Sequence, residues 1–240
     1  MNETPSAPPS RSAMLRSVVS RAALAEGAAR AVDSGGAGIA DLRRDAWGHG
    51  LLDVAHAVIG AGASAVRVDG AAEVSRLTAA GIRATADQPA DLDPRLLYGL
   101  PDAQGVLPGT PALRLVGRVL STKDIAAGGG VSYGYIHRAP VDSRLALVTG
   151  GYAQGVVRAL GSRAVVEIDG AVRPIVGRIA MDVCVVDIGD ADVALGAEAT
   201  YFGGRGPVAA GLADWVRITG MTAGELVAVA GQRTERAWEA

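Results

Sequence analysis

The chain has 240 residues, of which 49% are hydrophobic and only 4% aromatic, and it carries a formal net charge of −2. This length allows one large domain or two modest ones, with a core built from Ala, Val, Leu and Ile. The charge argues against a nucleic-acid surface, which needs a basic patch. The single cysteine, Cys184, excludes an internal disulfide and a multi-cysteine metal site, so we expect no metal.

Residues 1–13 are rich in Pro and Ser and lack the hydrophobic core of a signal peptide. This composition predicts a disordered tail. No stretch approaches 18 uninterrupted apolar residues, the length that a membrane span requires. We therefore expect a cytoplasmic protein with no membrane partner.

Helix and strand patterns alternate in the first third of the chain. The expected elements are a helix over 21–32 capped by Ser20, a strand over 37–42, a helix over 51–60, a strand over 65–68, and a helix over 73–80 ended by Gly81. This alternation is typical of a parallel sheet or barrel.

A polar loop, residues 43–50, separates the first predicted strand from the helix that follows it. Junctions of this kind collect ligands at the carboxyl ends of parallel strands. His49 lies between two glycines in this loop. It either touches a ligand or makes hydrogen bonds at the start of the helix.

The α/β pattern stops after about 100 residues. Residues 83–93 are polar, and residues 94–101 lead into a glycine- and proline-rich link ending near Pro111. A complete (β/α)₈ barrel takes about 250 residues. The available length suits three or four units of roughly 30 residues each. This part therefore forms a small open layer, or packs on the second half or on a partner.

From residue 112 onward the pattern predicts short strands separated by turns. They cover residues 113–120, 131–137, 145–149, 164–168, 172–176, 183–188 and 199–202. Asp169 and Gly170 form a type I′ hairpin signal. A late helix over 221–230 has Thr222 as its cap and Gly231 as its stop. We predict two domains, an α/β segment over 14–111 and a mainly antiparallel β domain over 112–240, either a small barrel or a sandwich.

Tyr133 follows a glycine turn in the stretch 128–138 and has Gly134 directly after it. A tyrosine held there can offer its hydroxyl to a reacting centre. An ordinary phenol has a pKa of about 10, so it needs a positive neighbour to act as a base. The alternative is an aromatic strand residue that packs beside the turn.

Three motifs of the second half, taken together, resemble the alanine racemases. Residues 131–134, Val-Ser-Tyr-Gly, resemble the family's catalytic-tyrosine motif, and residues 151–155, Gly-Tyr-Ala-Gln-Gly, resemble its Gly-Tyr-Ala-Asp-Gly. Residues 174–182 are close to the family pattern throughout. The resemblance implies a (β/α)₈ barrel followed by a β domain, a pyridoxal 5′-phosphate cofactor and a dimer. It also implies Tyr133 as the catalytic residue, with Tyr152 and Met181 at the substrate or active-site entry.

The first half resembles the family with alterations. Residues 43–50 are similar to Lys-Ala-Asn/Asp-Ala-Tyr-Gly-His-Gly, so Arg43 stands at the lysine that forms the Schiff base and Trp47 at a phosphate-binding tyrosine. Gly224 stands at another phosphate-binding tyrosine. The barrel strands expected between residues 82 and 94 are missing, and with them the arginine that binds the substrate carboxylate. The chain is thus interpreted as carrying an α/β remnant of the (β/α)₈ barrel.

These features leave several readings of function open. The chain is a racemase homologue with impaired activity, a partner that donates Tyr133 to a full-length racemase, or a weak pyridoxal phosphate-dependent isomerase that uses noncovalent cofactor or its single lysine, Lys123. A gene fragment without a selected role is a further alternative. The resemblance implies a homodimer, or a heterodimer with a full-length racemase, and a small amino acid as substrate if the chain is active.

Overall fold

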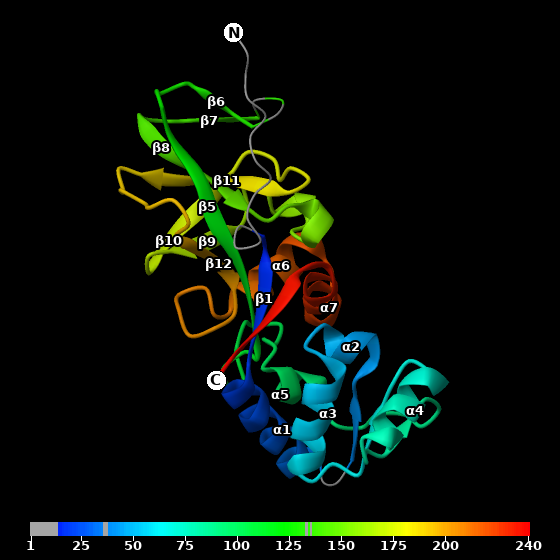
Figure 1. Cartoon of the computed structure of the whole chain (residues 1–240). Helices are drawn as coiled ribbons and strands as arrows, with labels where there is room; N and C mark the ends of the chain where they lie inside the picture. The colour runs from blue at the N-terminus through cyan, green and yellow to red at the C-terminus, as the bar shows by residue number, and fades with distance from the viewer. Residues whose placement is uncertain (1–13, 36–37, 133, 135) are drawn as a thin grey trace.

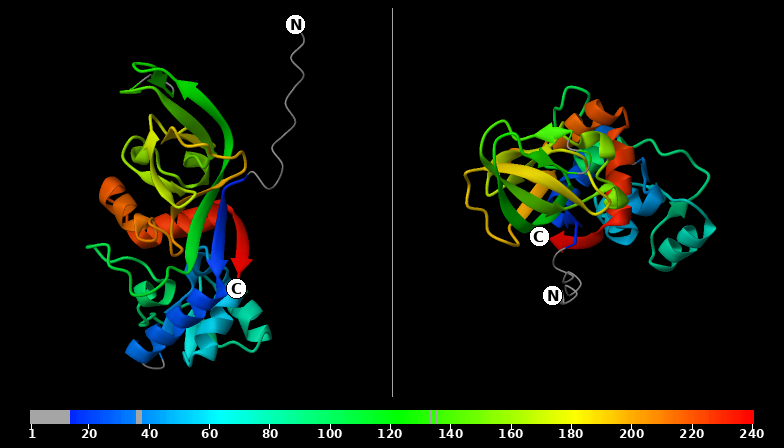
Figure 2. Two further views of the ribbon diagram at one scale, coloured as in Figure 1. Left: turned by 90° about the vertical axis from the view of Figure 1, so that its left-hand side faces the viewer. Right: turned by 90° about the horizontal axis from the view of Figure 1, so that it is seen from above.

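The computed structural model describes residues 14–35, 38–132, 134 and 136–240. They form two parts along one long axis, with a closed antiparallel sheet in the upper part and a smaller α/β unit below it (Figure 1). Strands β1 (Arg16–Ser20) and β13 (Glu235–Glu239) run side by side from the sheet toward the α/β unit (Figure 2).

The α/β unit contains a three-stranded parallel sheet, as the alternating pattern predicts. Its order is β2 (Ile39–Asp41), β3 (Ala65–Arg67), β4 (Ala84–Thr85). Helix α3 (Leu51–Gly60) follows β2, and α4 (Ala71–Ala79) follows β3. Strand β4 was not predicted, because it has only two residues within a polar stretch and forms by pairing with β3.

Two further helices cover this unit. Helix α1 (Arg21–Gly35) begins at the predicted cap, where the Ala23 N–H donates to Ser20 Oγ at 3.3 Å. Helix α5 (Pro94–Tyr98) is capped in the same way by Asp93. The two helices pack closely at Gly27, where a Cβ atom would lie 2.1 Å from the Leu97 carbonyl oxygen. Glycine is therefore required at this crossing.

The second half folds as a six-stranded antiparallel barrel, one of the two architectures predicted for it. Its strands are β5 (Leu113–Ile125), β8 (Ser143–Thr149), β9 (Val165–Ile168), β10 (Ala171–Val176), β11 (Val183–Gly189) and β12 (Glu198–Phe202). The order β12-β9-β10-β11-β8-β5 closes because β5 also pairs with β12. The long β5 reaches both neighbours and also pairs with β1. Closure leaves these six strands without a free edge.

Four details of the second half differ from the sequence-based expectation. The strand predicted over 131–137 is wrong, because β6 (Gly130–Val131) and β7 (His137–Arg138) pair antiparallel and the chain reverses between them. Helix α7 (Ala223–Arg233) continues past Gly231, its predicted stop. Helix α6 (Gly211–Thr219) and two 3₁₀ turns, Tyr152–Gln154 and Arg158–Leu160, were not predicted.

The predicted hairpin turn is confirmed. Asp169 and Gly170 both have positive φ angles, +51° and +76°, as a type I′ turn requires, and they join β9 to β10.

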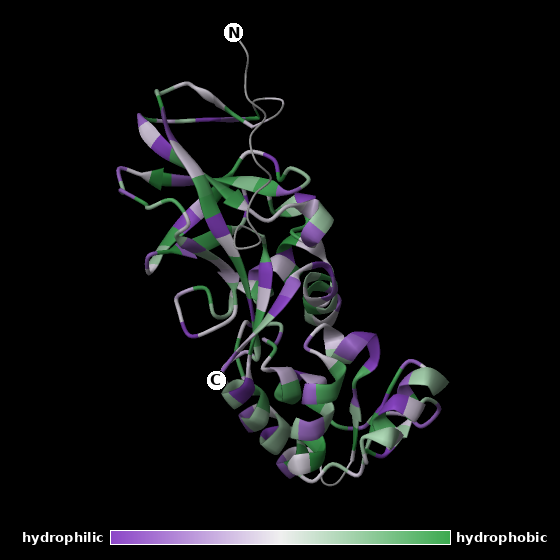
Figure 3. Ribbon diagram, viewed as in Figure 1, coloured by the Kyte–Doolittle hydropathy of each residue, from purple (hydrophilic) through white to green (hydrophobic). Residues whose placement is uncertain are grey.

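One hydrophobic core extends from the α/β unit into the barrel. Figure 3 shows hydrophobic residues, in green, along the strands of the barrel that contribute to this core. Trp215 of α6 is fully buried and packs edge-on against Tyr201 and Phe202 of β12. Within the part of the chain that the structure describes, no helix is both long and apolar enough to span a bilayer.

Candidate functional site

The loop predicted over residues 43–50 is a compact left-handed turn. Arg44, Asp45, Ala46 and Trp47 all have φ between +53° and +56°, within the element α2 (Arg43–Trp47). The left-handed region costs an L-residue about 1–2 kcal/mol. Four consecutive residues there need compensating contacts from the surrounding structure.

Those contacts come largely from the C-terminal segment. Arg236 of β13 forms an ion pair with Asp45 and donates from Nε to the Gly48 carbonyl oxygen at 3.2 Å. Gln232 of α7 donates to the Arg44 carbonyl oxygen at 3.1 Å. A Cβ atom on Gly48 would lie 2.6 Å from the Cα of Gly231, so α7 packs directly on the turn. The turn is therefore held by hydrogen bonds from side chains 188 to 191 positions later in the chain.

His49 is buried beneath this turn. Its Nδ1 lies 3.0 Å from the Ala46 carbonyl oxygen and 3.1 Å from that of Trp47, and its ring stacks on Tyr98 at 4.3 Å. Both neighbours are acceptors, so Nδ1 carries the hydrogen and Nε2 keeps its lone pair. Burial lowers the pKa of His49 to about 4, against the opposing effect of the two carbonyl bonds. Of the two readings of His49, the hydrogen-bonding one fits these contacts.

Arg43 follows the end of β2 and donates two parallel hydrogen bonds to Asp41. Its Nε donates to Oδ1 at 2.9 Å and its Nη2 to Oδ2 at 2.6 Å. Burial raises the pKa of Asp41, but the hydrogen bonds and charge of Arg43 outweigh it, and the net shift is downward. The hydrogen bond that Arg43 donates to Asp41 raises the pKa of Arg43. The guanidinium is thus fixed as a cation in a bidentate pair.

Trp47 forms one wall of an open cleft of about 390 Å³ between α2, the end of β3 and the start of α7. The residues that line the cleft are Asp41, Arg43, Arg44, Trp47, Asp69, Thr222, Gly224, Glu225 and Ala228. The indole lies against Gly224, where a Cβ atom would be 2.4 Å from a ring carbon. Arg43, Trp47 and Gly224, which are far apart in the sequence, therefore meet at one site.

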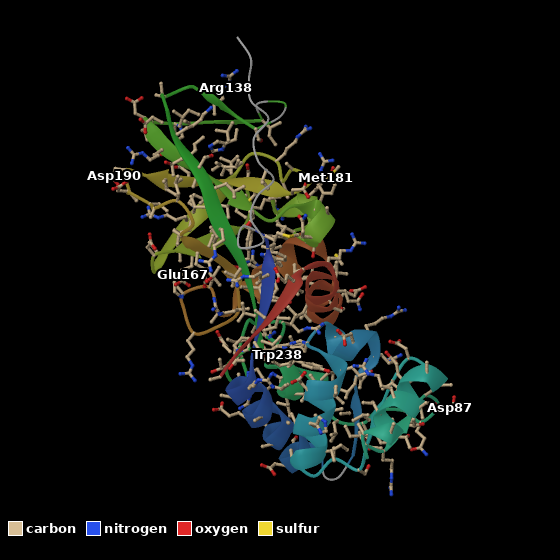
Figure 4. The ribbon with its side chains drawn as sticks, in the orientation of Figure 1. Asp87, Arg138, Glu167, Met181, Asp190 and Trp238 are labelled. Carbon is tan, nitrogen blue, oxygen red and sulfur yellow. The ribbon has the colours of Figure 1, made fainter. Side chains whose placement is uncertain are left out.

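Tyr152 and Met181 lie together elsewhere, on the barrel. The Tyr152 N–H donates to the Ala180 carbonyl oxygen at 3.0 Å, and the Ala153 N–H donates to that of Met181 at 3.0 Å. Both side chains are exposed, Met181 by 55% and Tyr152 by 37%. Met181 is at the barrel end of the molecule, away from α2 (Figure 4). Tyr133 falls outside the described residues.

Other reactive groups lie apart from the cleft. Lys123 is exposed on β5, where that strand pairs with β8. Cys184 is buried in the barrel, and burial raises its pKa to about 12 against the opposing hydrogen bond with Tyr201. Among residues 14–35, 38–132, 134 and 136–240, no three His, Cys, Asp or Glu side chains are grouped to hold a metal ion.

A family model for the C-terminal domain of alanine racemase matches residues 112–238, just over half of the chain. The chain belongs to the alanine racemase family. Tyr133, Tyr152 and Met181 fall within the matched residues, whereas Arg43 and Trp47 lie before them.

Curated relatives agree with this assignment. The chain is 45% identical to alanine racemase of Mycobacterium ulcerans over 121 residues, 49% of this chain and 31% of the relative. It is 44% identical to that of Mycobacterium leprae over 137 residues, 55% of this chain and 35% of the relative. These matches span about a third of the length of the relatives.

Solved alanine racemases share the fold. The Streptomyces coelicolor structure aligns with a TM-score of 0.82 at 20% identity, covering 95% of this chain and 98% of that one. The Bartonella henselae structure, described with covalently bound pyridoxal phosphate, aligns with a TM-score of 0.74 at 17% identity, covering 95% of this chain and all of that one.

Asp41, Asp69, Glu225 and Arg236 are site residues that sequence reasoning missed. Asp41 stands two positions before Arg43, so a local charge pair was visible in the sequence. No sequence signal connects Arg236 with Asp45.

Proposed function

We propose that this chain is an alanine racemase homologue without independent racemase activity. The observation that carries the proposal is the bidentate pair between Arg43 and Asp41, at the position where the family resemblance puts the lysine that forms the Schiff base. Racemisation through pyridoxal phosphate needs a primary amine that is neutral when it attacks the coenzyme aldehyde. A guanidinium stays protonated, with a pKa above about 12, and cannot take this role.

The rest of the cleft also argues against a covalently held coenzyme. Its walls carry Asp69 and Glu225 beside the indole of Trp47, which fills the space in front of Gly224. The single lysine, Lys123, belongs to the barrel strand β5 and is not among the residues that line the cleft. The residues present therefore do not fit covalent pyridoxal phosphate.

A racemisation assay tests this proposal. Purified protein is incubated with excess pyridoxal phosphate and L-alanine, and D-alanine is measured against a full-length racemase as positive control. We expect no D-alanine above the rate of free coenzyme. Turnover that depends on the protein would refute the proposal, and its loss in Lys123→Ala would identify the weak isomerase reading as correct.

A second candidate is a non-catalytic partner that docks on a full-length racemase and donates Tyr133. The exposed side chains of Met181 and Tyr152 support it, because they leave an apolar surface uncovered beside this part of the barrel. Co-expression with a host racemase, followed by pull-down and assay, tests this candidate. We expect a stable complex whose activity falls in Tyr133→Phe. This candidate is excluded if the host racemase does not copurify with this chain. It is also excluded if the racemase has the same activity with the wild-type chain and with Tyr133→Phe.

A further inference from the structure

The large side chain of Trp47 packs against Gly224, which has no side chain. Trp47 is partly buried and packs on the main core, with its ring 5.5 Å from that of Tyr98 on the α/β side. On the α7 side the ring touches residue 224 so closely that a Cβ atom there would lie 2.4 Å from Cζ3 and 3.0 Å from Cη2. Real Cβ atoms do not approach ring carbons to 2.4 Å, so the indole occupies its place only because residue 224 has no side chain.

The start of α7, which also lines the cleft, is already capped by its own residues. Glu225 accepts the Thr222 N–H at 2.7 Å and the Thr222 hydroxyl at 2.8 Å, while the Glu225 N–H donates to Thr222 Oγ1. The first turn of a helix attracts anions through free N–H groups. Here a carboxylate takes that place, and the hydrogen bonds from Thr222 lower the pKa of Glu225 and keep it charged.

A second carboxylate faces the same space from the α/β unit. Asp69, just after β3, accepts the Arg44 N–H at 2.6 Å and stays 39% exposed at its side chain. Arg44, the second cation of the cleft lining, is 76% exposed and 3.8 Å from Asp69. The end of the cleft near α7 therefore combines an indole wedge with two carboxylates.

We propose that Trp47 closes this end of the cleft to a phosphate group, with the carboxylate of Glu225 beside it, so that restoring a lysine at position 43 does not by itself create a pyridoxal phosphate site. The proposal rests on the proposed function in taking this cleft as the coenzyme position. Trp47 and Gly224 act in it as one coupled pair.

The coupling is tested by thermal unfolding of Gly224→Ala, Trp47→Ala and the double variant. In the presence of Trp47, Gly224→Ala lowers Tm by about 5 °C, because the added methyl group overlaps the indole. In the Trp47→Ala background the same change lowers Tm by less than about 2 °C. Gly60→Ala is the matched control, since nothing lies within 4 Å of a Cβ atom there. Equal losses in both backgrounds would overturn the coupling.

Phosphate exclusion is tested by reductive labelling with pyridoxal phosphate and borohydride at alkaline pH, with the modified peptides mapped by mass spectrometry. Lys123 is an internal reference in every sample, because it is exposed on β5 and is not among the residues that line the cleft. In Arg43→Lys, we expect labelling at position 43 no higher than at Lys123. In Arg43→Lys combined with Trp47→Ala, we expect several-fold more labelling at position 43.

Two outcomes would overturn the proposal. Preferential labelling of position 43 in Arg43→Lys alone would mean that the cleft admits the phosphate with Trp47 in place. Equal labelling in the single and double variants, both folded by their Tm values, would mean that Trp47 does not close it. Racemisation by the unmodified chain would refute the proposed function. It would not affect the comparison of labelling at position 43 between the single and double variants.

Discussion

Lowering the pH from about 7 to about 5 is expected to destabilise this protein through one side chain, His49. The ordinary pKa of 6.5 applies in the unfolded chain, and burial lowers it to about 4 in the folded one. Between these values the unfolded chain binds a proton at this imidazole and the folded chain does not. The free energy of unfolding therefore falls as the pH falls through this window.

The size of the loss follows from how far the pH lies below 6.5, the pKa of His49 in the unfolded chain. Each pKa unit corresponds to about 1.4 kcal/mol, so His49 removes about 2 kcal/mol of stability at about pH 5. Asp41 does not interfere, because its pKa lies below 3.8 and its stabilising contribution is lost only at lower pH. This loss is a large share of a typical folding free energy of about 5–15 kcal/mol.

Urea unfolding at the two pH values measures this loss in the wild-type chain, in His49→Asn and in the control His56→Asn. A change in the absolute stability of a variant does not affect the test, because the comparison is between pH values within each variant. We expect His49→Asn to reduce the pH-dependent loss by about 2 kcal/mol and His56→Asn, at an exposed position, to leave it unchanged. The same pH dependence in wild type and His49→Asn would refute the burial argument.

Three further predictions concern contacts of the fold. Arg236→Met is expected to cost about 2 kcal/mol in urea unfolding, because it leaves Asp45 and the left-handed turn without their cation; an unchanged midpoint would contradict this. Gly231→Ala is expected to lower the free energy of unfolding by about 2 kcal/mol or more, because its Cβ atom would lie 2.6 Å from Gly48. The control Gly60→Ala is expected to leave this free energy almost unchanged. Equal unfolding midpoints for the two variants would contradict this prediction. Cys184 is expected to resist a thiol reagent in the native protein and to react on unfolding, and fast native labelling would contradict its burial.

The sequence predicts helix caps and turns correctly where neighbouring residues determine them. Ser20 and Thr222 cap the helices as expected, and Asp169 with Gly170 makes the expected turn, because each of these effects depends on residues within a few positions. Strands β1 and β13 escape prediction because their pairing joins Arg16 to Glu235. Helix α7 passes Gly231 because that glycine is used to approach Gly48 rather than to end the helix.

The candidate site is predictable only in part for the same reason. The family motifs locate Arg43 and Trp47, and periodicity places them after a strand. The left-handed path of Arg44 to Trp47 is imposed by Arg236 and Gln232, which no local pattern connects with the turn. The fit of Trp47 on Gly224 likewise needs the packing of α7 against the α/β unit.

Arg43, bound to Asp41, cannot hold the coenzyme through an imine. The absorbance spectrum of the purified protein mixed with pyridoxal phosphate measures this property. We expect the spectrum of the free aldehyde, unchanged by the protein. An imine band that survives gel filtration of the protein, with one coenzyme retained per chain, would contradict this expectation.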